Sequence, residues 1–362
     1  FYQHRDFYSL LPFGFGGIIS LDKDVFGFGS RLQNKKKQNN YVNTFQLGFD
    51  YSNQKDQRDR YRNNFGEEGE NVFSQLEKFS SFGLYVLNQA EFENGVLLRL
   101  GSRFDSNKIA TDNMNESIIL NKLNPSIGIT YNTNNRSNLF ITVGTSFETP
   151  TLNELSNNPT GGMGFNKDLE PISSLSYEYG WKGNFSNSSL EIIGYNILSS
   201  NEILPFELEE YPGKNFYRNV GETSRSGLEL SWNYFFTTAA IQLSYTISDN
   251  KFKSYEINDS QLKGKKIPGI PNQLFDLSAL FKLQKELNLK MNYQFVGKRF
   301  ADNLNLTEIE SHSLLSFKIS KPFYVKRIKL NSFIGVNNIL NEKYFDNIRL
   351  NAFGKRYYEP AP

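Results

Sequence analysis

Residues 44–51, TFQLGFDY, alternate strictly between polar and apolar side chains. The same alternation runs through residues 227–234 (GLELSWNY) and residues 287–295 (LNLKMNYQF). Successive side chains of a β-strand point to opposite faces, so each segment has one apolar face and one polar face. Such segments suit a wall that has lipid on one side and water on the other.

About fourteen segments of this kind follow one another, and their connections alternate between short and long. Short turns at one end and long loops at the other are typical of an outer-membrane β-barrel, whose long loops lie outside the cell. The sequence therefore predicts an all-β fold, a transmembrane antiparallel β-barrel in one domain over residues 1–362. Phe45, Leu47, Phe49 and Tyr51 are expected to face lipid. The expected strands are 17–33, 43–54, 77–92, 95–105, 124–132, 137–147, 173–183, 187–198, 215–235, 238–248, 272–283, 287–296, 312–320 and 327–336.

The composition agrees with a barrel wall. Aromatic residues make up 15% of the chain, with 32 Phe and 20 Tyr, as suits aromatic girdles at the membrane interfaces. The mean hydropathy is −0.52, and no stretch approaches the roughly 20 apolar residues of a membrane helix. The net charge of +2 gives no field that favours nucleic acid. The absence of cysteine excludes disulfides and thiolate metal sites.

The sequence gives no support for catalysis, a cofactor or a metal site. The two histidines, His4 and His312, lie far apart, and neither stands in a cysteine or carboxylate cluster at ligand spacing. Motifs of serine hydrolases, zinc proteases and phosphate-binding loops are absent from the sequence. An enzyme carried on a barrel is therefore disfavoured. A passive fourteen-stranded porin or fatty-acid-type channel stays open on pattern alone, because even strand counts from about 8 upward close barrels.

Several segments resemble, in family order, elements of TonB-dependent outer-membrane receptors. The stretches 49–64 and 75–92 look most like the ferric-siderophore branch of that family. The resembling segments are YNTNNRSNLFITVGTSFETPTLNEL (131–155), NKDLEPISSLSYEYGWKG (166–183), RNVGETSRSGLELSWNY (218–234), IPGIPNQLFDLSALF (267–281), FIGVNNILNEKYFDN (333–347) and NAFGKRYYEPAP (351–362).

The resemblance implies a plugged barrel of twenty-two strands in the outer membrane of a Gram-negative bacterium. This chain would supply about fourteen of them, so we expect a fragment that lacks the plug, the first strands and the last strand. The implied function is import of a metal chelate, with a ferric siderophore as first expectation and cobalamin, haem or a glycan as alternatives. The implied partners are the chelate, the TonB complex through an N-terminal region outside this chain, and outer-membrane lipid with lipopolysaccharide.

The expected ligand surface consists of the long loops 55–76, 148–172, 199–214 and 297–311. Arginine forks suit the anionic oxygens of an iron chelate, and tyrosine adds a flat contact. Opposite charges in the same run also fit a solvated, self-compensated loop. The best single patch for the ligand is Arg58, Arg60, Tyr61 and Arg62, beside Asp56 and Asp59.

Two further sets of residues have structural expectations. Polar residues on the inner face are expected to hydrate the wall and pair across strands. They are Asp50, Arg99, Arg103, Asp105, Glu178, Glu229, Asp276 and Lys290. After the strand 137–147, Pro150 is expected to end the ladder because it lacks an N–H group, while Phe147, Leu152 and Leu155 cover the edge.

Overall fold

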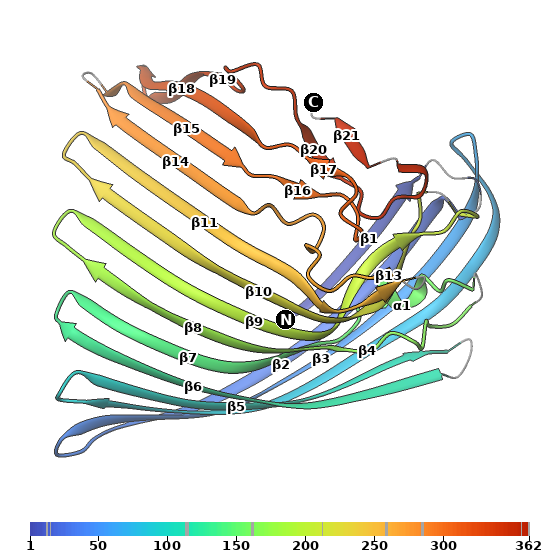
Figure 1. Cartoon of the computed structure of the whole chain (residues 1–362), viewed down its shortest axis with the longest axis horizontal. Helices are drawn as coiled ribbons and strands as arrows, with labels where there is room; N and C mark the ends of the chain where they lie inside the picture. Colours follow the sequence, from blue (N-terminus) through green and yellow to red (C-terminus); the bar gives the residue numbers. More distant parts are fainter. Residues whose placement is uncertain are drawn as a thin grey trace.

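A computed structural model describes residues 1–11, 14, 16–112, 116–160, 163–211, 213–257, 260–283, 286–355 and 357–360. One antiparallel sheet of 15 strands makes up most of the structure. Each strand of this sheet pairs with the strand that follows it in sequence order within the sheet. The sheet curves into a broad wall whose edges are β1 and β19 (Figure 1). Its strands are β1 (Tyr2–Leu10), β2 (Ile18–Lys37), β3 (Tyr41–Asn64), β4 (Glu67–Phe92), β5 (Val96–Thr111), β6 (Glu116–Asn134), β7 (Ser137–Glu148), β8 (Ile172–Asn184), β9 (Ser188–Glu207), β10 (Asn215–Phe235), β11 (Ala239–Ser254), β14 (Gln273–Lys282), β15 (Asn288–Val296), β18 (His312–Val325) and β19 (Ile328–Val336).

The apolar face of the wall points outward, as the alternation predicts. Phe45 and Leu47 of β3 are 41% and 42% exposed, and Leu32, which lies opposite Leu47 on β2, is 72% exposed. Two packed sheets would have buried these side chains between them. The exposed row in a single curved sheet therefore confirms a barrel wall and excludes a sandwich. We call the opposite face, which carries Asp50, the inner face.

Strands β3 and β4 extend well beyond the apolar belt. After Tyr51, the outward positions of β3 become polar: Asn53, Lys55, Gln57 and Asp59. A membrane-spanning strand needs only about 9–11 residues, whereas β3 has 24. The prediction of a loop over residues 55–76 is therefore wrong, because most of these residues belong to β3 and β4. The turn between the two strands is only Phe65–Gly66, and both residues have positive φ. Residues 106–123, which separate the expected strands 95–105 and 124–132, are likewise mostly strand, within β5 and β6.

Strand β1 is a fifteenth strand that the sequence pattern missed. Residues 1–10, FYQHRDFYSL, mix charged and aromatic side chains without a clear period of two. Their strand conformation comes from pairing with β2, which runs in register from Tyr2 opposite Phe26 to Leu10 opposite Ile18. Pairing with β2, and not the local sequence pattern, therefore determines that residues 2–10 form a strand.

The two ends of the wall differ. Tight turns join the strands at the left of Figure 1, and the folded connections lie at the right, which we call the loop end. Three small clusters of buried apolar side chains lie outside the sheet's lipid-facing belt. None of the helices in the described residues is long and apolar enough to cross a membrane. The short elements are α1 (Leu152–Ser156), β12 (Glu256–Ile257), β13 (Ser260–Gln261), β16 (Arg299–Phe300), β17 (Glu308–Ile309), β20 (Phe345–Ile348), the 3₁₀ turn η2 (Phe353–Lys355) and β21 (Tyr358–Pro360).

Candidate ligand-binding region at the loop end

The connection between β7 and β8 starts with a one-turn helix fixed by local sequence. β7 ends at Glu148, and Pro150 follows, which confirms that the ladder stops before this proline. Thr151 caps α1: its Oγ1 accepts from the Glu154 N–H at 3.2 Å, and the Glu154 carboxylate accepts from the Thr151 N–H at 2.8 Å. This reciprocal capping box sets the direction in which the chain leaves the strand.

Helix α1 packs into the interior. Leu152 and Leu155 are 7% and 1% exposed and pack with Ile109 of β5. The expectation that these leucines cover the sheet edge is therefore wrong, because burial against the inner face removes more apolar surface from water. Phe165 and Leu169, farther along the same connection, complete the cluster.

The far part of this connection binds β10. The Asn166 amide donates to the Tyr217 carbonyl at 3.3 Å, and the Glu170 N–H donates to the Asn219 Oδ1 at 2.7 Å. Asn219 in turn donates to the Glu170 carbonyl at 2.8 Å. Residues 149–160 and 163–171 therefore lie across the inner side of the loop end, and we call them the inward segment.

A buried polar network joins the inward segment to the β3–β4 hairpin. Arg58 donates from Nε to Glu77 at 2.8 Å and from Nη2 at 3.2 Å, and the two residues are 4% and 0% exposed. Ser156 and Gln75 also donate to the Glu77 carboxylate. Arg58 reaches Asn153 at 3.3 Å. These bonds satisfy a carboxylate that would otherwise be costly to bury.

Arg60 lies one inward position farther along β3. It is 6% exposed, and its Nη2 donates to Asn157 at 2.7 Å. Its guanidinium carbon lies 4.9 Å from the ring centroid of Phe73. Burial, together with the charge of Arg58, lowers the pKa of Arg60 to about 10.

The structure separates the four residues of the expected ligand patch. They lie on strand β3 and not in a loop, so the side chains alternate between faces. Arg58 and Arg60 point inward and are buried, whereas Tyr61 lies on the other face. Arg62 is half-exposed, with its Nε 3.6 Å from Glu70. The sequence suggested that Asp56 and Asp59 compensate the arginines of this run. In the structure, Glu77 of β4 takes that part for Arg58.

A cavity of about 500 Å³ lies between the inner face of the sheet and residues 149–153 of the inward segment. Cavities of this size hold small molecules. Asp56, which is 3% exposed, accepts two bonds from the Gln54 amide, and burial raises the pKa of Asp56. The other charged and aromatic side chains around this cavity are Arg5, Lys23, Arg58, Phe7 and Phe79.

The last part of the chain also contributes to the loop end. Arg349 forms an ion pair with Glu207 at 2.6 Å and donates to the Gly213 carbonyl at 2.9 Å. Asn351 donates to the Pro205 carbonyl at 3.2 Å. These partners lie 136 to 146 residues away, so no local sequence signal could have indicated them.

Among the expected inner polar residues, Arg103 and Asp50 pair across strands as predicted. Arg103 lies 2.8 Å from Asp50 and 2.7 Å from Asp105. Gly83 faces this group, and a side chain there would overlap the Arg103 guanidinium. The pairs therefore account for Arg103, Asp50 and Asp105 without a bound solute.

The structure corrects the expectation that neither histidine has carboxylates beside it. His4 lies 3.1 Å from Asp24, 3.4 Å from Asp6 and 3.6 Å from Asp22. The β1–β2 pairing brings these residues together, which spacing within the sequence could not indicate. The ligand atoms of His4, Asp6 and Asp22 lie close enough together to share a metal ion, but these side chains are exposed, and exposed acidic groups are common without one.

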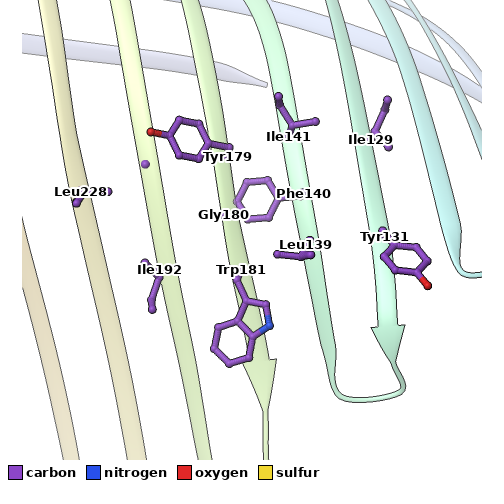
Figure 2. Close-up of a pocket in the computed structure, with 11 residues that line it drawn as sticks. Ile129, Tyr131, Leu139, Phe140, Ile141, Tyr179, Gly180, Trp181, Ile192 and Leu228 are labelled. Atoms are coloured by element: carbon purple, nitrogen blue, oxygen red, sulfur yellow. The ribbon is translucent and has the colours of Figure 1, made fainter.

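A second hollow, of about 560 Å³, lies on the outer face of β6 to β10 (Figure 2). Its lining is almost entirely apolar and includes Ile129, Ile141, Trp181 and Ile192. Gly194 leaves room there for the Tyr179 ring, since a Cβ at 194 would lie 2.6 Å from that ring. The hollow belongs to the lipid-facing belt and offers no charged group to a chelate.

Comparisons with known proteins agree with this architecture. Vitamin B12 transporter BtuB of Vibrio vulnificus is 25% identical over 240 residues, which cover 64% of this chain and 35% of that protein. The ferric citrate transporter FecA in its unliganded form superposes with a TM-score of 0.78 at 18% identity, covering 100% of this chain and 56% of FecA. The siderophore receptor PiuA of Acinetobacter baumannii superposes with a TM-score of 0.73 at 18% identity, covering 95% of this chain and 55% of PiuA.

The chain thus spans about half the length of these structures and about a third of the BtuB relative. A family model described as "TonB dependent receptor-like, beta-barrel" matches residues 1–339. Proteins of this family lie in the outer membrane of Gram-negative bacteria, and the match decides against the passive-porin alternative. The chain belongs to the TonB-dependent receptor β-barrel family.

Proposed function

We propose that the protein containing this chain imports a ferric siderophore across the outer membrane by TonB-dependent transport. The observation that carries this proposal is the inward segment, which closes over a charged cavity at the loop end of a barrel wall of this family. A receptor of this kind needs a binding region that faces the outside and opens into a polar lumen. Solved structures of a ferric citrate transporter and of a siderophore receptor share this fold, which supports the proposal.

The ligand-binding part of the proposal assigns different tasks to the four expected residues. Arg58 positions the inward segment through Glu77 and Asn153. Arg60 is 6% exposed and donates to Asn157 of the inward segment, so the half-exposed Arg62 is the arginine of the patch that can meet a chelate. Tyr61 faces away from them and is the weakest member.

The proposed partners follow from the family. The TonB complex would couple the proton-motive force to ligand release, through a region outside these residues. The apolar belt would contact membrane lipid and, on the outer leaflet, lipopolysaccharide. No cofactor and no catalytic step are part of the proposal, in keeping with a family of receptors and transporters.

Uptake of ⁵⁵Fe-labelled chelates tests this function. The natural protein is placed in a Gram-negative strain that lacks its own siderophore receptors, with and without a working TonB complex. We expect uptake of at least one ferric siderophore, lost on deletion of TonB. Uptake that persists without TonB would contradict coupled transport. If the cells accumulate none of the ferric siderophores tested, the proposed ligand class is contradicted.

Cobalamin is the second candidate, because the BtuB relative is named as a vitamin B12 transporter. The same strains, given ⁵⁷Co-labelled cobalamin, separate the two candidates. TonB-dependent cobalamin uptake without iron uptake would favour this alternative.

A further inference from the structure

Strands β18 and β19 form a hairpin that extends past the neighbouring strands at the tight-turn end of the wall. The last pair between β15 and β18 is Asn288 with Ser320, whereas β18 continues to Val325 and pairs there with β19 alone. By comparison, β14 and β15 end level with each other, at Lys282 and Asn288. Residues 321–332 therefore form a two-stranded projection about 16 Å long, which we call the hairpin extension. Two strands alone are only marginally stable in water, so a contact on one face would stabilise it.

The outward face of the hairpin extension continues the lipid-facing row of the wall. Along β18 the outward positions include Ile319, Phe323 and Val325, and Leu330 and Ile328 stand opposite the last two on β19. These five apolar side chains are between 40% and 63% exposed. A contiguous set of exposed apolar side chains marks a contact surface. Because this set is continuous with the apolar belt, the contact that fits it is the membrane.

The charge of the same hairpin has one sign. Residues 311–341 contain five cations and no aspartate or glutamate, although the whole chain has a net charge of only +2. None of the five forms an ion pair with a carboxylate of the residues that the structure describes. A negatively charged surface complements such a hairpin. The five cations are Lys318, Lys321, Lys326, Arg327 and Lys329.

Three of these cations frame the apolar positions. Lys321 lies in the outward row between Ile319 and Phe323, where its long stem can follow the row while the ammonium group reaches the interface. The tip of the hairpin is Lys326–Arg327, and Lys326 has a φ of 56°. Two-residue hairpin turns favour asparagine or glycine at positive φ. The tip therefore carries two cations where backbone conformation alone would favour other residues.

We propose that the hairpin extension docks on the membrane leaflet at the tight-turn end and binds the phosphate groups of anionic phospholipids. In this arrangement the apolar positions lie at the top of the acyl chains, and Lys321, Lys326 and Arg327 lie at the level of the phosphates. Ammonium and guanidinium groups both bind phosphate, and a cluster of them favours anionic over neutral headgroups. The inference is independent of the transported ligand and requires only that the wall lie in the outer membrane.

Hydrogen exchange of the natural protein in lipid nanodiscs tests the docking. One preparation contains phosphatidylcholine alone, and the other contains equal parts of phosphatidylcholine and phosphatidylglycerol. We expect amide exchange in residues 321–332 to slow about 10-fold or more in the anionic discs, because each cation near such a surface contributes about a 5-fold preference. The triple variant with Lys321→Gln, Lys326→Gln and Arg327→Gln should lose this difference.

The matched control removes the same number of charges from another strand end on the same side of the wall, by Lys35→Gln, Lys36→Gln and Lys37→Gln in β2. This variant should keep the protection of residues 321–332, and heat-modifiable migration on a gel should show that both variants are folded. Equal exchange in the two kinds of disc would overturn the proposal, as would a difference that survives the triple substitution in the hairpin extension. Exchange already as slow in neutral detergent as in anionic discs would mean that another segment of the protein covers the hairpin, which also overturns it.

Discussion

Arg58 and Glu77 form a two-point ion pair inside the protein, diagonally across the β3–β4 ladder. Nε and Nη2 of Arg58 lie 2.8 Å and 3.2 Å from the two Glu77 carboxylate oxygens. The hydroxyl of Ser156 donates to the same carboxylate, so the pair also holds α1. A contact between two neighbouring strands therefore fixes the position of a segment that lies some eighty residues away in the sequence.

Breaking this pair from one side should be costly. Glu77→Gln or Arg58→Met leaves one buried charge without its partner, and we expect a loss of about 3–5 kcal/mol in the free energy of unfolding. Urea unfolding of the detergent-solubilised protein measures the loss, and protease cleavage within residues 149–171 reports release of the inward segment. Arg62→Met is the matched control, because Arg62 is half-exposed beside Glu70 and should cost less than about 1 kcal/mol. Equal effects of Arg58→Met and Arg62→Met would contradict the structural role of the buried pair.

Gly221 should not tolerate a side chain. A Cβ at this position would overlap the carbonyl oxygen of Ser254 on β11, next to the irregular pairing at Glu222 and Thr223. A backbone carbonyl cannot rotate away as a side chain can, so Gly221→Ala should cost about 1–3 kcal/mol. Hydrogen exchange should rise in residues 215–223. Gly14→Ala, where a Cβ would meet no atom within 4 Å, should leave stability unchanged, and similar losses in both variants would contradict this reading.

Raising the pH should stabilise the region around Lys214. Its pKa is about 8 in the folded protein and 10.5 for an ordinary lysine, so above pH 8 the folded form releases this proton first. The unfolded form then binds more protons, and stability rises with pH between about 8 and 10.5. Arg60 titrates near 10, so the comparison belongs between pH 7.5 and 9.5. Hydrogen exchange of residues 213–217 should slow over this range, and Lys214→Met should abolish the change.

The two faces of β7 should respond in opposite ways to a new charge. Ile141 points outward and is 48% exposed to the membrane side, whereas its neighbour Thr142 points inward. Ile141→Lys should cost about 2–4 kcal/mol if it lies near the bilayer midplane. Thr142→Lys, which would stand opposite Glu178, should cost little. Urea-dependent folding into lipid vesicles compares the two variants, and equal costs would argue against lipid on the outer face.

The wall could be predicted from the sequence because its signal is local. Lipid outside and water inside impose a period of two on each strand, so Phe45, Leu47 and their neighbours reveal their faces directly. The same reasoning fails for β1, where aromatic and charged residues stand side by side and pairing with β2 decides the conformation. It also fails for residues 55–76, because a strand that rises above the membrane loses the apolar half of its pattern.

The loop end could not be predicted in detail because its contacts are distant in sequence. Arg58 was expected to be free in a loop, but Glu77 lies 19 residues away and buries it. The Arg60 contact with Asn157 spans 97 residues. Polar runs such as 55–64 look the same in a sequence whether they are solvated or enclosed, since enclosure depends on what folds over them.

The inward segment connects strands that are far apart in the sheet. Arg58 and Arg60 of β3 bind its first part, and Tyr217 and Asn219 of β10 bind its last part, with six strands between β3 and β10. The bend of the wall at this end is thereby set by side-chain bonds across the opening as well as by strand twist. A substitution that releases the inward segment should therefore disturb β3 and β10 together, because the segment is bonded to both strands.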